Sequence, residues 1–240
     1  MSENAQSTNR LLASLTPADF ALLKPHLKTV DLIHKAVLFE AGDEVDHVYF
    51  PHSGIVSLVV DLAGGETIEA ATIGCNSIVG GASALAGRVS LNKAIVQLPG
   101  RTSVLDVEWL RKAADASIAF RTTLIQHEQV LFAQAQQSAA CNAIHSVEAR
   151  MARWLLRSHD LCGADNLRMT QEFLAQLLGV RRTSVSIVAS TLQQAGLISY
   201  RRGRISVTNL PGLQEAACEC YGTVKSHYDQ LLNGNQPLAG

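Results

Sequence analysis

Residues 169–198 read MTQEFLAQLLGVRRTSVSIVASTLQQAGLI, a pattern of two short amphipathic helices separated by a glycine. Thr170 is a typical helix N-cap, and Gly179 tolerates the positive φ that a sharp turn requires. The spacing therefore predicts a first helix between these two residues. A second helix is predicted over about 182–194, closed by Gly196. Two short helices joined by a glycine-containing turn predict a helix-turn-helix.

A β-hairpin is predicted immediately after the second helix. Residues 197–200 and 204–207 are short runs that contain β-branched and aromatic side chains. Arg201-Arg202-Gly203 supplies a tight turn between them. A hairpin in this position predicts the wing of a winged helix-turn-helix.

Charge along the same segment indicates phosphate binding. Residues 173–213 contain no Asp, Glu or Lys and five arginines, which are Arg181, Arg182, Arg201, Arg202 and Arg204. This window carries +5 in a chain whose net charge is -1. A basic region without acidic partners is the electrostatic footprint of a nucleic-acid-binding surface. The alternative is a solvated basic face without a ligand.

The N-terminal end of the second helix is expected to enter the major groove of DNA, where side chains reach base edges. The predicted DNA contacts there are Arg181, Arg182, Thr183, Ser184 and Ser186. Arg182 can donate two hydrogen bonds to one guanine, whereas Thr183 and Ser186 suit either a base or a phosphate. Val185, Val188, Ala189 and Leu192 are expected on the core side of this helix, and the orientation of Ile187 stays open.

Two other groups of residues are expected to contact the DNA backbone. Thr170 and Gln171 lie at the start of the first helix, where amides and hydroxyls commonly touch phosphate. Arg201, Arg202 and Arg204 should flank the groove and position the wing.

The first half of the chain is predicted to be a β domain. Residues 42–100 contain nine of the 17 glycines, placed between short β-branched runs. A hairpin is predicted over 55–73, and two more strands over 93–98 and 101–105. Many short strands with glycine turns predict a barrel or sandwich. Glu66 and Glu69, on the predicted hairpin, are expected to face solvent.

One long helix is predicted from about Ser117 to Ala143, because residues 101–162 contain neither glycine nor proline. Phe120, Leu124, Leu131, Ala135 and Ala139 recur at three- and four-residue steps or multiples of them. Such a helix could pair with its copy in a homodimer or pack on its own domain. The sequence favours the dimer without fixing the register of the seam.

Composition excludes several classes of protein. With 47% hydrophobic and 17% charged residues in 240, the chain has material for a buried core and is not expected to be disordered. No apolar run approaches the roughly 20 residues of a membrane helix, so no membrane association is expected. Residues 1–10 lack the apolar core of a signal peptide. Five scattered cysteines fit reduced thiols, so the cytoplasm is the expected compartment.

The stretch from Val180 to Ser186, followed by residues 192–198, resembles the winged helix-turn-helix of the Crp/Fnr family of bacterial transcription regulators. The order of parts agrees, since that family joins a β-roll, a long dimerisation helix and a winged helix. The resemblance implies an α+β chain with a cyclic-nucleotide-binding-like β-roll (a jelly roll) over 1–115, a dimerisation helix over 116–146 and a winged helix-turn-helix over 147–240. It also implies a homodimer on an inverted-repeat operator of double-stranded DNA, with RNA polymerase as a further partner.

The effector site departs from the family pattern. Cyclic-AMP-binding members resemble one another in a cassette with Gly-Glu before a short helix and Arg-Ser or Arg-Thr after it. Here Gly81 stands at the Glu position, and Asn92 and Lys93 stand near the Arg-Ser position. The candidate effector residues are therefore Gly80, Gly81, Ala82, Ser83, Arg88, Asn92 and Lys93, and cyclic AMP is not the expected ligand. Control by another effector and DNA binding without any effector both remain open.

No resident metal or other cofactor is predicted. The first cysteine is Cys75, so the N-terminal cysteine cluster of an iron–sulfur oxygen sensor is missing. Cys218 and Cys220 are expected to point apart as helical neighbours two residues apart, which makes a poor chelate. Structural roles are expected for His47 and His52.

The sequence offers two candidates for redox chemistry and no motif for catalysis. Cys75 and Cys141 are candidates for redox activity, which depends on their exposure and pKa. The sequence has no lysine-containing phosphate loop, nucleophile elbow or HExxH run, so no enzyme is predicted. The competing function is a signalling module whose β-roll binds a partner protein rather than DNA.

Overall fold

The computed structural model describes residues 8–162 and 166–233. Two short helices, α1 (Arg10–Ser14) and α2 (Pro17–Leu23), and the 3-10 helix η2 (Lys24–His26) precede the first strand. Thr16 caps α2 by accepting a hydrogen bond from the amide of Asp19 at 3.1 Å. Residues 1–10 were expected not to form a signal peptide, and residues 1–7 of this segment lie outside the described residues.

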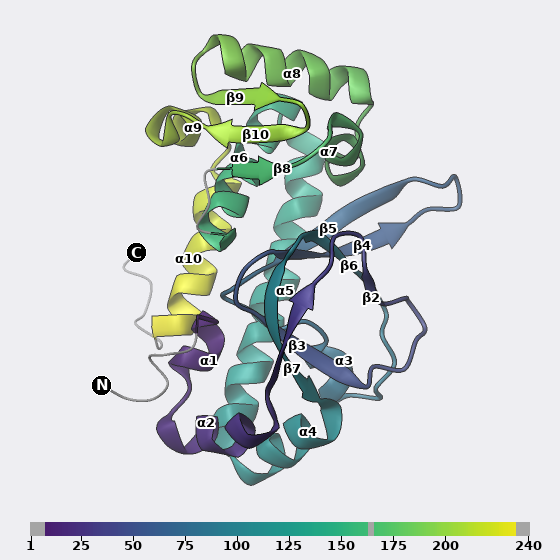
Figure 1. Cartoon of the computed structure of the whole chain (residues 1–240), viewed down its shortest axis with the longest axis vertical. Helices are drawn as coiled ribbons and strands as arrows, with labels where there is room; N and C mark the ends of the chain where they lie inside the picture. The colour runs from purple at the N-terminus through teal and green to yellow at the C-terminus, as the bar shows by residue number, and fades with distance from the viewer. Residues whose placement is uncertain (1–7, 163–165, 234–240) are drawn as a thin grey trace.

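Seven strands form the predicted β-roll, built from two antiparallel sheets (Figure 1). One sheet has the order β1-β7-β3 and the other has the order β2-β6-β4-β5. The apolar side chains between the sheets include Phe50, Val56, Val96 and Leu105, all buried in one core. The bounds are β1 Lys28–Leu32, β2 Val37–Phe39, β3 His47–Pro51, β4 Ile55–Asp61, β5 Thr67–Ile73, β6 Lys93–Leu98 and β7 Gly100–Asp106, with the short helix α3 (Gly81–Leu85) between β5 and β6.

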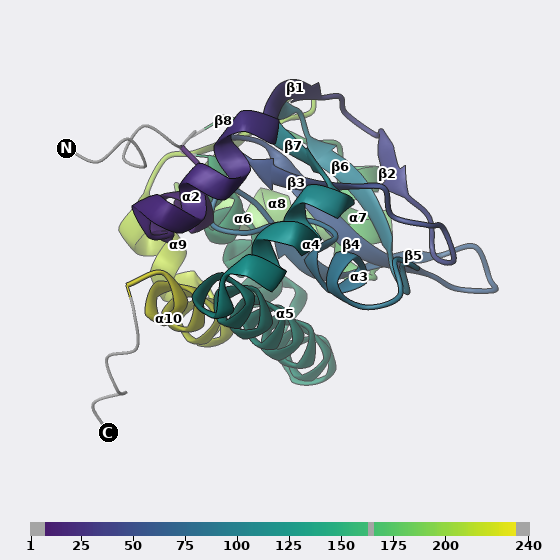
Figure 2. The same cartoon turned by 90° about the horizontal axis from the view of Figure 1, so that it is seen from below.

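Two helices follow the β-roll and are seen from below in Figure 2. The sequence analysis missed α4 (Val107–Ala116), which Asp106 caps through a 2.8 Å hydrogen bond from the amide of Glu108. The long helix α5 runs from Ile118 to Ile144, one residue from the predicted bounds at each end. The long-helix prediction is confirmed, and α4 separates it from the last strand.

The long helix packs on its own domain through part of its surface. Phe120 and Leu124 are buried in the β-roll core, and Leu131 packs against that core. Ala139, by contrast, is exposed. Most of the positions that indicated a dimer seam therefore pack against the β-roll of the same chain.

The winged helix-turn-helix prediction is confirmed. Helix α6 (Val147–Cys162) leads to α7 (Gln171–Leu178), and Gly179 ends α7 with φ 61 before α8 (Arg182–Gln194) begins. The wing contains β9 (Ile198–Arg201) and β10 (Arg204–Val207) and ends at α9 (Leu210–Ala216). A third wing strand that the sequence analysis missed, β8 (Asn166–Arg168), pairs with β10 in a sheet of order β8-β10-β9.

Helix α10 (Cys220–Asn233) was also missed. It starts near the DNA-binding end of the molecule and runs back along α5, as the yellow helix in Figure 1 shows. The segment 147–240 therefore contains a helix that packs on the long helix rather than on the wing. Residues 234–240 of that segment lie outside the described part.

A buried carboxylate joins the β-roll to α6, the first helix of the C-terminal part. Glu69 of β5 is 9% exposed and accepts hydrogen bonds from Trp154 Nε1 of α6 at 2.9 Å and from Thr72 Oγ1 at 2.7 Å. Ser57 Oγ donates to the other carboxylate oxygen. The expectation that Glu69 faces solvent is wrong, because the hairpin lies against α6 and α7 rather than projecting freely. Among the described residues, no helix has the length and apolar composition needed to cross a membrane.

Candidate nucleic-acid interface

Helix α8 is divided into a buried face and an exposed face, as expected for a recognition helix. Val185, Ala189 and Leu192 are buried in the core of the winged helix. Ile187, whose orientation the sequence left open, is 68% exposed and lies on the outer face with Thr183. An exposed isoleucine on this face can contact the methyl group of a thymine.

The predicted base-contacting residues lie at the start of α8. Arg181, Arg182 and Thr183 are exposed, whereas Ser184 and Ser186 are half-buried. Arg181 occupies the N-cap position without a side-chain cap hydrogen bond, and its carbonyl accepts from the amide of Ser184 at 2.9 Å. These residues form one continuous polar surface at the helix N-terminus, where phosphate binding is favoured.

The start of α7 is held against α8. Ser186 Oγ donates to Gln171 Oε1 at 2.7 Å, which joins the two helices at the ends that should meet DNA. Thr170 Oγ1 accepts from the amide of Phe173 at 3.2 Å and caps α7. The lone pair of Thr170 is used in the cap, while its hydroxyl proton remains available for a phosphate oxygen.

The wing tip places a charged residue in an unusual backbone conformation. Arg202 and Gly203 form the two-residue turn between β9 and β10, with φ values of 50 and 72. Positive φ at both central residues is the signature of a type I′ turn, which favours Asn and Gly. Arginine is a costly choice for its first position, so the turn conformation does not by itself explain the arginine at the tip.

Three arginines lie side by side across the wing sheet. The antiparallel register pairs Arg204 with Arg168 of β8 on one side and with Arg201 of β9 on the other. Directly opposed residues share one face of a sheet with Cβ atoms roughly 5 Å apart. All three side chains are exposed. The sequence analysis missed Arg168 because the strand that brings it to the wing lies outside the helix-turn-helix motif.

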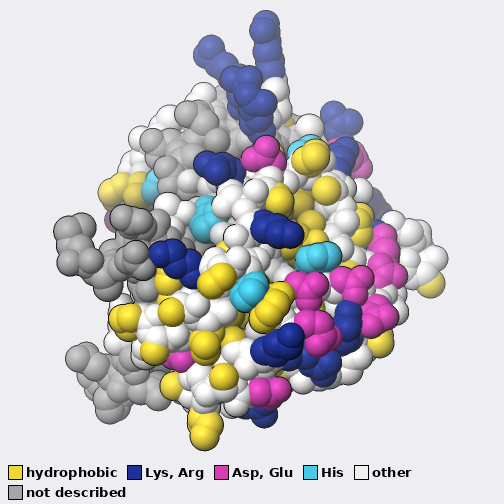
Figure 3. Space-filling model, turned by 60° about the horizontal axis from the view of Figure 1, so that its bottom comes forward, with side chains coloured by type: hydrophobic (Ala, Val, Ile, Leu, Met, Phe, Trp, Pro, Cys, Tyr) yellow, Lys and Arg dark blue, Asp and Glu magenta, His cyan; other side chains and the backbone are white. Residues whose placement is uncertain are grey.

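Like charges in adjacent strands repel one another unless an anion lies between them. Within residues 8–162 and 166–233, no carboxylate forms an ion pair with any arginine from α8 or the wing. Figure 3 shows Lys and Arg side chains projecting beyond the upper edge of the molecule, whereas acidic side chains lie mostly lower on that face, mixed with basic ones. The arrangement favours a polyanion as the ligand of this surface.

Gly81 of the cyclic-nucleotide cassette lies close to the side chain of Glu128. Gly80 precedes α3 with φ 85, and Gly81 is buried. A Cβ at Gly81 would lie 2.8 Å from Glu128 Oε1 of α5. A glutamate there, which would hold the ribose in cyclic-AMP-binding relatives, would require Glu128 to move. Ala82 is exposed, and Ser83 is half-buried.

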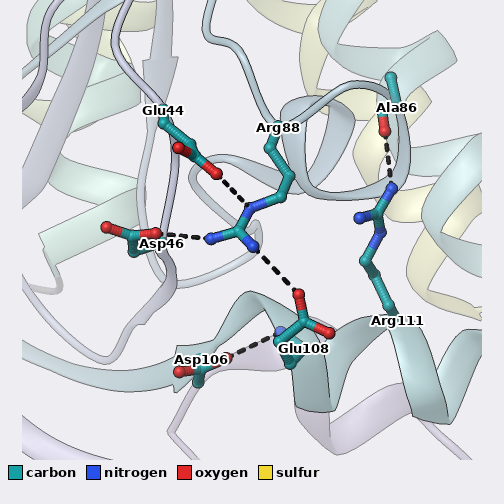
Figure 4. Close-up of polar contacts among 7 residues, drawn as sticks. All are labelled: Glu44, Asp46, Ala86, Arg88, Asp106, Glu108 and Arg111. Atoms are coloured by element: carbon teal, nitrogen blue, oxygen red, sulfur yellow. Dashed lines mark hydrogen bonds and ion pairs between the residues drawn. The ribbon is translucent and has the colours of Figure 1, made fainter.

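The two candidate cations of the effector site are already paired with carboxylates. Arg88 contacts Glu44 at 3.2 Å, Asp46 at 2.5 Å and Glu108 at 3.0 Å (Figure 4). A single guanidinium surrounded by three carboxylates leaves a local excess of negative charge, which disfavours a phosphate.

Lys93 is held in a similar way at a different place. Its ammonium group contacts Asp61 at 3.1 Å and Glu40 at 3.3 Å. These contacts, the hydrogen bond to Asp61 first, raise the pKa of Lys93. Asn92 is exposed, and its backbone N–H donates to Ser90 Oγ at 3.2 Å. Both candidate cations of the effector site are therefore engaged within the chain.

The predicted geometry of Cys218 and Cys220 is wrong. Cys218 lies in the loop between α9 and α10, and only Cys220 is helical, so the helical divergence does not apply. Instead, Cys141, His145, Cys218 and Cys220 present ligand atoms within 4.8 Å of one another. The sequence contains two short Cys- and His-containing segments, one with Cys141 and His145 and the other with Cys218 and Cys220. Their separation along the chain gave no indication that they lie together in the fold.

The remaining thiols and imidazoles lie elsewhere. Burial raises the pKa of Cys75, and it also raises the pKa of Cys141, so neither thiol carries the lowered pKa of a reactive cysteine. His52 Nε2 lies 2.7 Å from Ser103 Oγ, and burial lowers its pKa. His47 is exposed on β3.

Comparisons with known families and proteins agree with this architecture. The family model described as cyclic nucleotide-binding domain matches residues 32–116, and the one described as Crp-like helix-turn-helix domain matches residues 149–216. A global nitrogen regulator of Synechococcus elongatus is 24% identical over 187 residues, which cover 74% of this chain and 84% of that protein. The global nitrogen regulator of Synechocystis is 23% identical over 203 residues, or 81% and 89% of the two chains.

Solved structures share the fold at low sequence identity. FixK2 from Bradyrhizobium japonicum has a TM-score of 0.65 at 16% identity, over 80% of this chain and 98% of that one. A CRP-family transcriptional regulator from Thermus thermophilus has a TM-score of 0.64 at 22% identity, over 78% and 96%. With both domain types matched in the same order, the chain belongs to the Crp/Fnr family of transcription regulators.

Proposed function

We propose that this regulator is a cytoplasmic homodimer that binds an inverted-repeat operator and does not use cyclic AMP as its effector. The observation that carries the proposal is the row of Arg168, Arg204 and Arg201 beside the exposed start of α8. In this arrangement the wing cations would contact phosphates while α8 enters the adjacent major groove.

Sequence readout would come from the outer face of α8. Arg182 can donate to a guanine, and Thr183 and Ile187 follow on the same exposed face. Ser186 and Gln171 bind each other, so their role is to hold the two helices of the motif in register. The proposal therefore divides the predicted contacts into base-reading, phosphate-binding and positioning groups.

The homodimer is supported by a second stripe on α5. Positions that alternate four and three residues apart are all exposed, and Ile118, Ile125 and Phe132 among them are 84%, 50% and 65% exposed. The stripe consists of Ile118, Thr122, Ile125, Gln129, Phe132, Gln136, Ala139 and Ala143. This is the heptad spacing of a left-handed coiled coil.

The exposed stripe lies on the opposite side of α5 from the buried one. Phe120 and Leu124 belong to the buried stripe and are offset by two residues, or roughly 200°, from the positions of the exposed stripe. One helix can therefore pack on its own β-roll and on a copy of itself. Pairing two copies of α5 would place the two α8 helices in one assembly, as a two-fold operator requires.

The effector proposal rests on the missing ribose-binding carboxylate and on the pairing of both candidate cations with carboxylates of the chain. Gly81 replaces the ribose-binding glutamate, and Arg88 is engaged by three carboxylates. A different ligand, a partner protein or DNA binding without an effector would all fit this arrangement. Contacts between β5 and α7 give the β-roll a direct path to the helix-turn-helix.

The proposal is tested by the binding of the purified chain to DNA from upstream of its own gene, with and without cyclic AMP, cyclic GMP and oxidant. Two protomers per operator and no response to either nucleotide are expected. A protein that ignores all duplexes at low salt would instead be the partner-binding β-roll module. Nucleotide-dependent binding would refute the effector part.

A substitution in α5 tests the proposed homodimer separately. Phe132→Asp is expected to give monomers in analytical ultracentrifugation and to weaken operator binding, because it puts charge into the exposed stripe. Leu91→Asp is the matched control, since Leu91 is 86% exposed on the β-roll outside α5. A dimeric Phe132→Asp protein would exclude this stripe as the seam.

A further inference from the structure

The end of the long helix and the start of α10 bring together four potential metal ligands. Cys141 lies in the last turn of α5, and His145 follows as its C-cap. Cys220 begins α10, and Cys218 lies just before it. The ligand atoms of these four residues lie within 4.8 Å of one another, although 77 residues of chain separate Cys141 from Cys218. The cluster is separate from the wing and from the cyclic-nucleotide cassette.

Two of the separations between ligand atoms are close to those of a tetrahedral site for one ion. Cys141 Sγ and Cys218 Sγ are 3.5 Å apart, and Cys220 Sγ is 3.6 Å from His145 Nδ1. In a tetrahedral zinc site with bonds of about 2.3 Å to sulfur and about 2.1 Å to nitrogen, neighbouring ligand atoms lie about 3.6 to 3.8 Å apart. The two observed contacts are close to these values, and the other ligand atoms of the group lie within 4.8 Å of one another.

The hydrogen bonds around the four residues also resemble those that orient metal ligands. His145 Nε2 lies 3.1 Å from Glu219 Oε1, which fixes the proton on Nε2 and leaves Nδ1 to face the thiols. A ligating histidine commonly donates its other ring N–H to a carboxylate in this way. Gln137 Nε2 donates to Cys220 Sγ at 3.0 Å, a contact that suits a thiolate acceptor.

Charge and burial fit a metal-thiolate centre as well. All three cysteines are buried, and they form their own small cluster with Ala149 packed against it. Arg153 interacts electrostatically with the Cys141 thiol, and Arg150 with the thiols of Cys141 and Cys218. Three thiolates and one zinc ion carry a net charge of -1, which these guanidinium groups would offset.

We propose that Cys141, His145, Cys218 and Cys220 bind one zinc ion in a closed structural site. Soft thiolates with one imidazole select zinc over magnesium or calcium, and a complete set of four protein ligands leaves no open position for catalysis. The ion would tie the end of α5 to the loop after α9 and to α10. It would thereby fix the junction at which the long helix passes into the DNA-binding part.

Binding of zinc would release protons. A cysteine binds zinc as a thiolate, so each of the three thiols must lose its proton to become a ligand. One Zn²⁺ replaces three thiol protons, so binding is expected to release close to three protons per ion and to weaken in acid.

The first test is the zinc content of the full-length chain, purified without chelators and measured by mass spectrometry of the metals. One zinc per protomer is expected in the wild-type protein and in Cys75→Ala, whose thiol lies outside the cluster. Cys218→Ala and His145→Ala are expected to lose the ion. A wild-type protein without zinc, zinc retained by both variants, or a Cys141–Cys218 disulfide in freshly extracted protein would overturn the proposal.

Cobalt substitution gives a readout that does not depend on variants that fold poorly. Zinc-depleted wild-type chain titrated with Co²⁺ is expected to show thiolate-to-cobalt charge transfer and the visible bands of tetrahedral cobalt, saturating at one ion per protomer. The charge-transfer intensity should correspond to three thiolates. Absence of these bands in reduced protein, or bands typical of an octahedral oxygen site, would contradict the zinc site whether or not the chain binds DNA.

Discussion

Arg88 in the β-roll and the arginines of the wing have opposite electrostatic surroundings. Arg88 of the β-roll is 25% exposed in its side chain and contacts three carboxylates. The arginines of the wing face one another across a sheet and have no carboxylate partner among the described residues. The same residue type therefore serves two purposes within one chain.

The difference shows how a cation's partners indicate its function. A guanidinium that is satisfied within the chain stabilises local structure and has little capacity for an external anion. Guanidinium groups held next to one another repel, and this repulsion is relieved when phosphates bind. The net charge of -1 for the whole chain shows neither the paired arginine of the β-roll nor the unpaired arginines of the wing among the described residues.

The largest effect on DNA binding is expected for Arg182→Ala. It should weaken operator binding by about 1 to 3 kcal/mol and relax discrimination at one base position, because a guanine-binding fork is lost. Binding to a set of operators with single substitutions measures both effects. An unchanged base preference would remove Arg182 from the base contacts.

A smaller and uniform effect is expected for Arg202→Asn. Asparagine tolerates the positive φ of the turn, so this variant removes the charge and keeps the wing fold. Affinity should fall similarly for all sequences, and the slope of log K against log salt should decrease by about one unit. Binding isotherms at several salt concentrations measure this slope, and an unaltered value would exclude a phosphate contact at the wing tip.

A local effect is expected for Ile187→Ala, which shortens an exposed side chain on the outer face of α8. Loss of an apolar contact with a thymine methyl should cost about 1 kcal/mol at one A·T pair and leave the salt slope unchanged. Thermal unfolding should not change, because the side chain is not in the core. Equal losses on all operators would argue against base readout by this residue.

The smallest effect on DNA binding is expected for Arg88→Met. Operator affinity should stay at the wild-type value, while stability falls by less than about 1 kcal/mol per lost pair because the carboxylates are more than half exposed. Added salt should restore part of this stability by screening Glu44, Asp46 and Glu108 from one another. Denaturant unfolding at low and high salt measures the change. A fall in operator affinity would contradict the assignment of Arg88 to local structure alone.

Much of the fold followed from local signals in the sequence. Thr170, Gly179 and Gly196 fixed the helix-turn-helix because caps and positive-φ turns depend on single residues. The long helix was predicted to within one residue because nothing in it interrupts helical backbone. The two faces of α8 followed from periodicity, except at Ile187.

The missed features depend on contacts between distant parts of the chain. Arg168 joins the wing only through the pairing of β8 with β10, and Glu69 is buried only because α6 lies over the hairpin. The group around Cys141 and Cys218 forms because α10 returns along α5. Local propensity does not encode such pairings, so the sequence analysis placed Glu69 in solvent and separated the two cysteines of the C-terminal pair.

The most direct test of the central claim compares the salt dependence of operator binding between wild type and a variant with Arg168, Arg201 and Arg204 all changed to Gln. A variant with Lys28, Lys112 and Lys225 changed to Gln is the control, since these exposed lysines lie outside the wing. The wing variant is expected to lose about three units of slope, at roughly 0.9 per phosphate contact, while the control keeps the wild-type slope. Equal slopes in the wild type and the wing variant would contradict the assignment of the wing arginines to DNA phosphates.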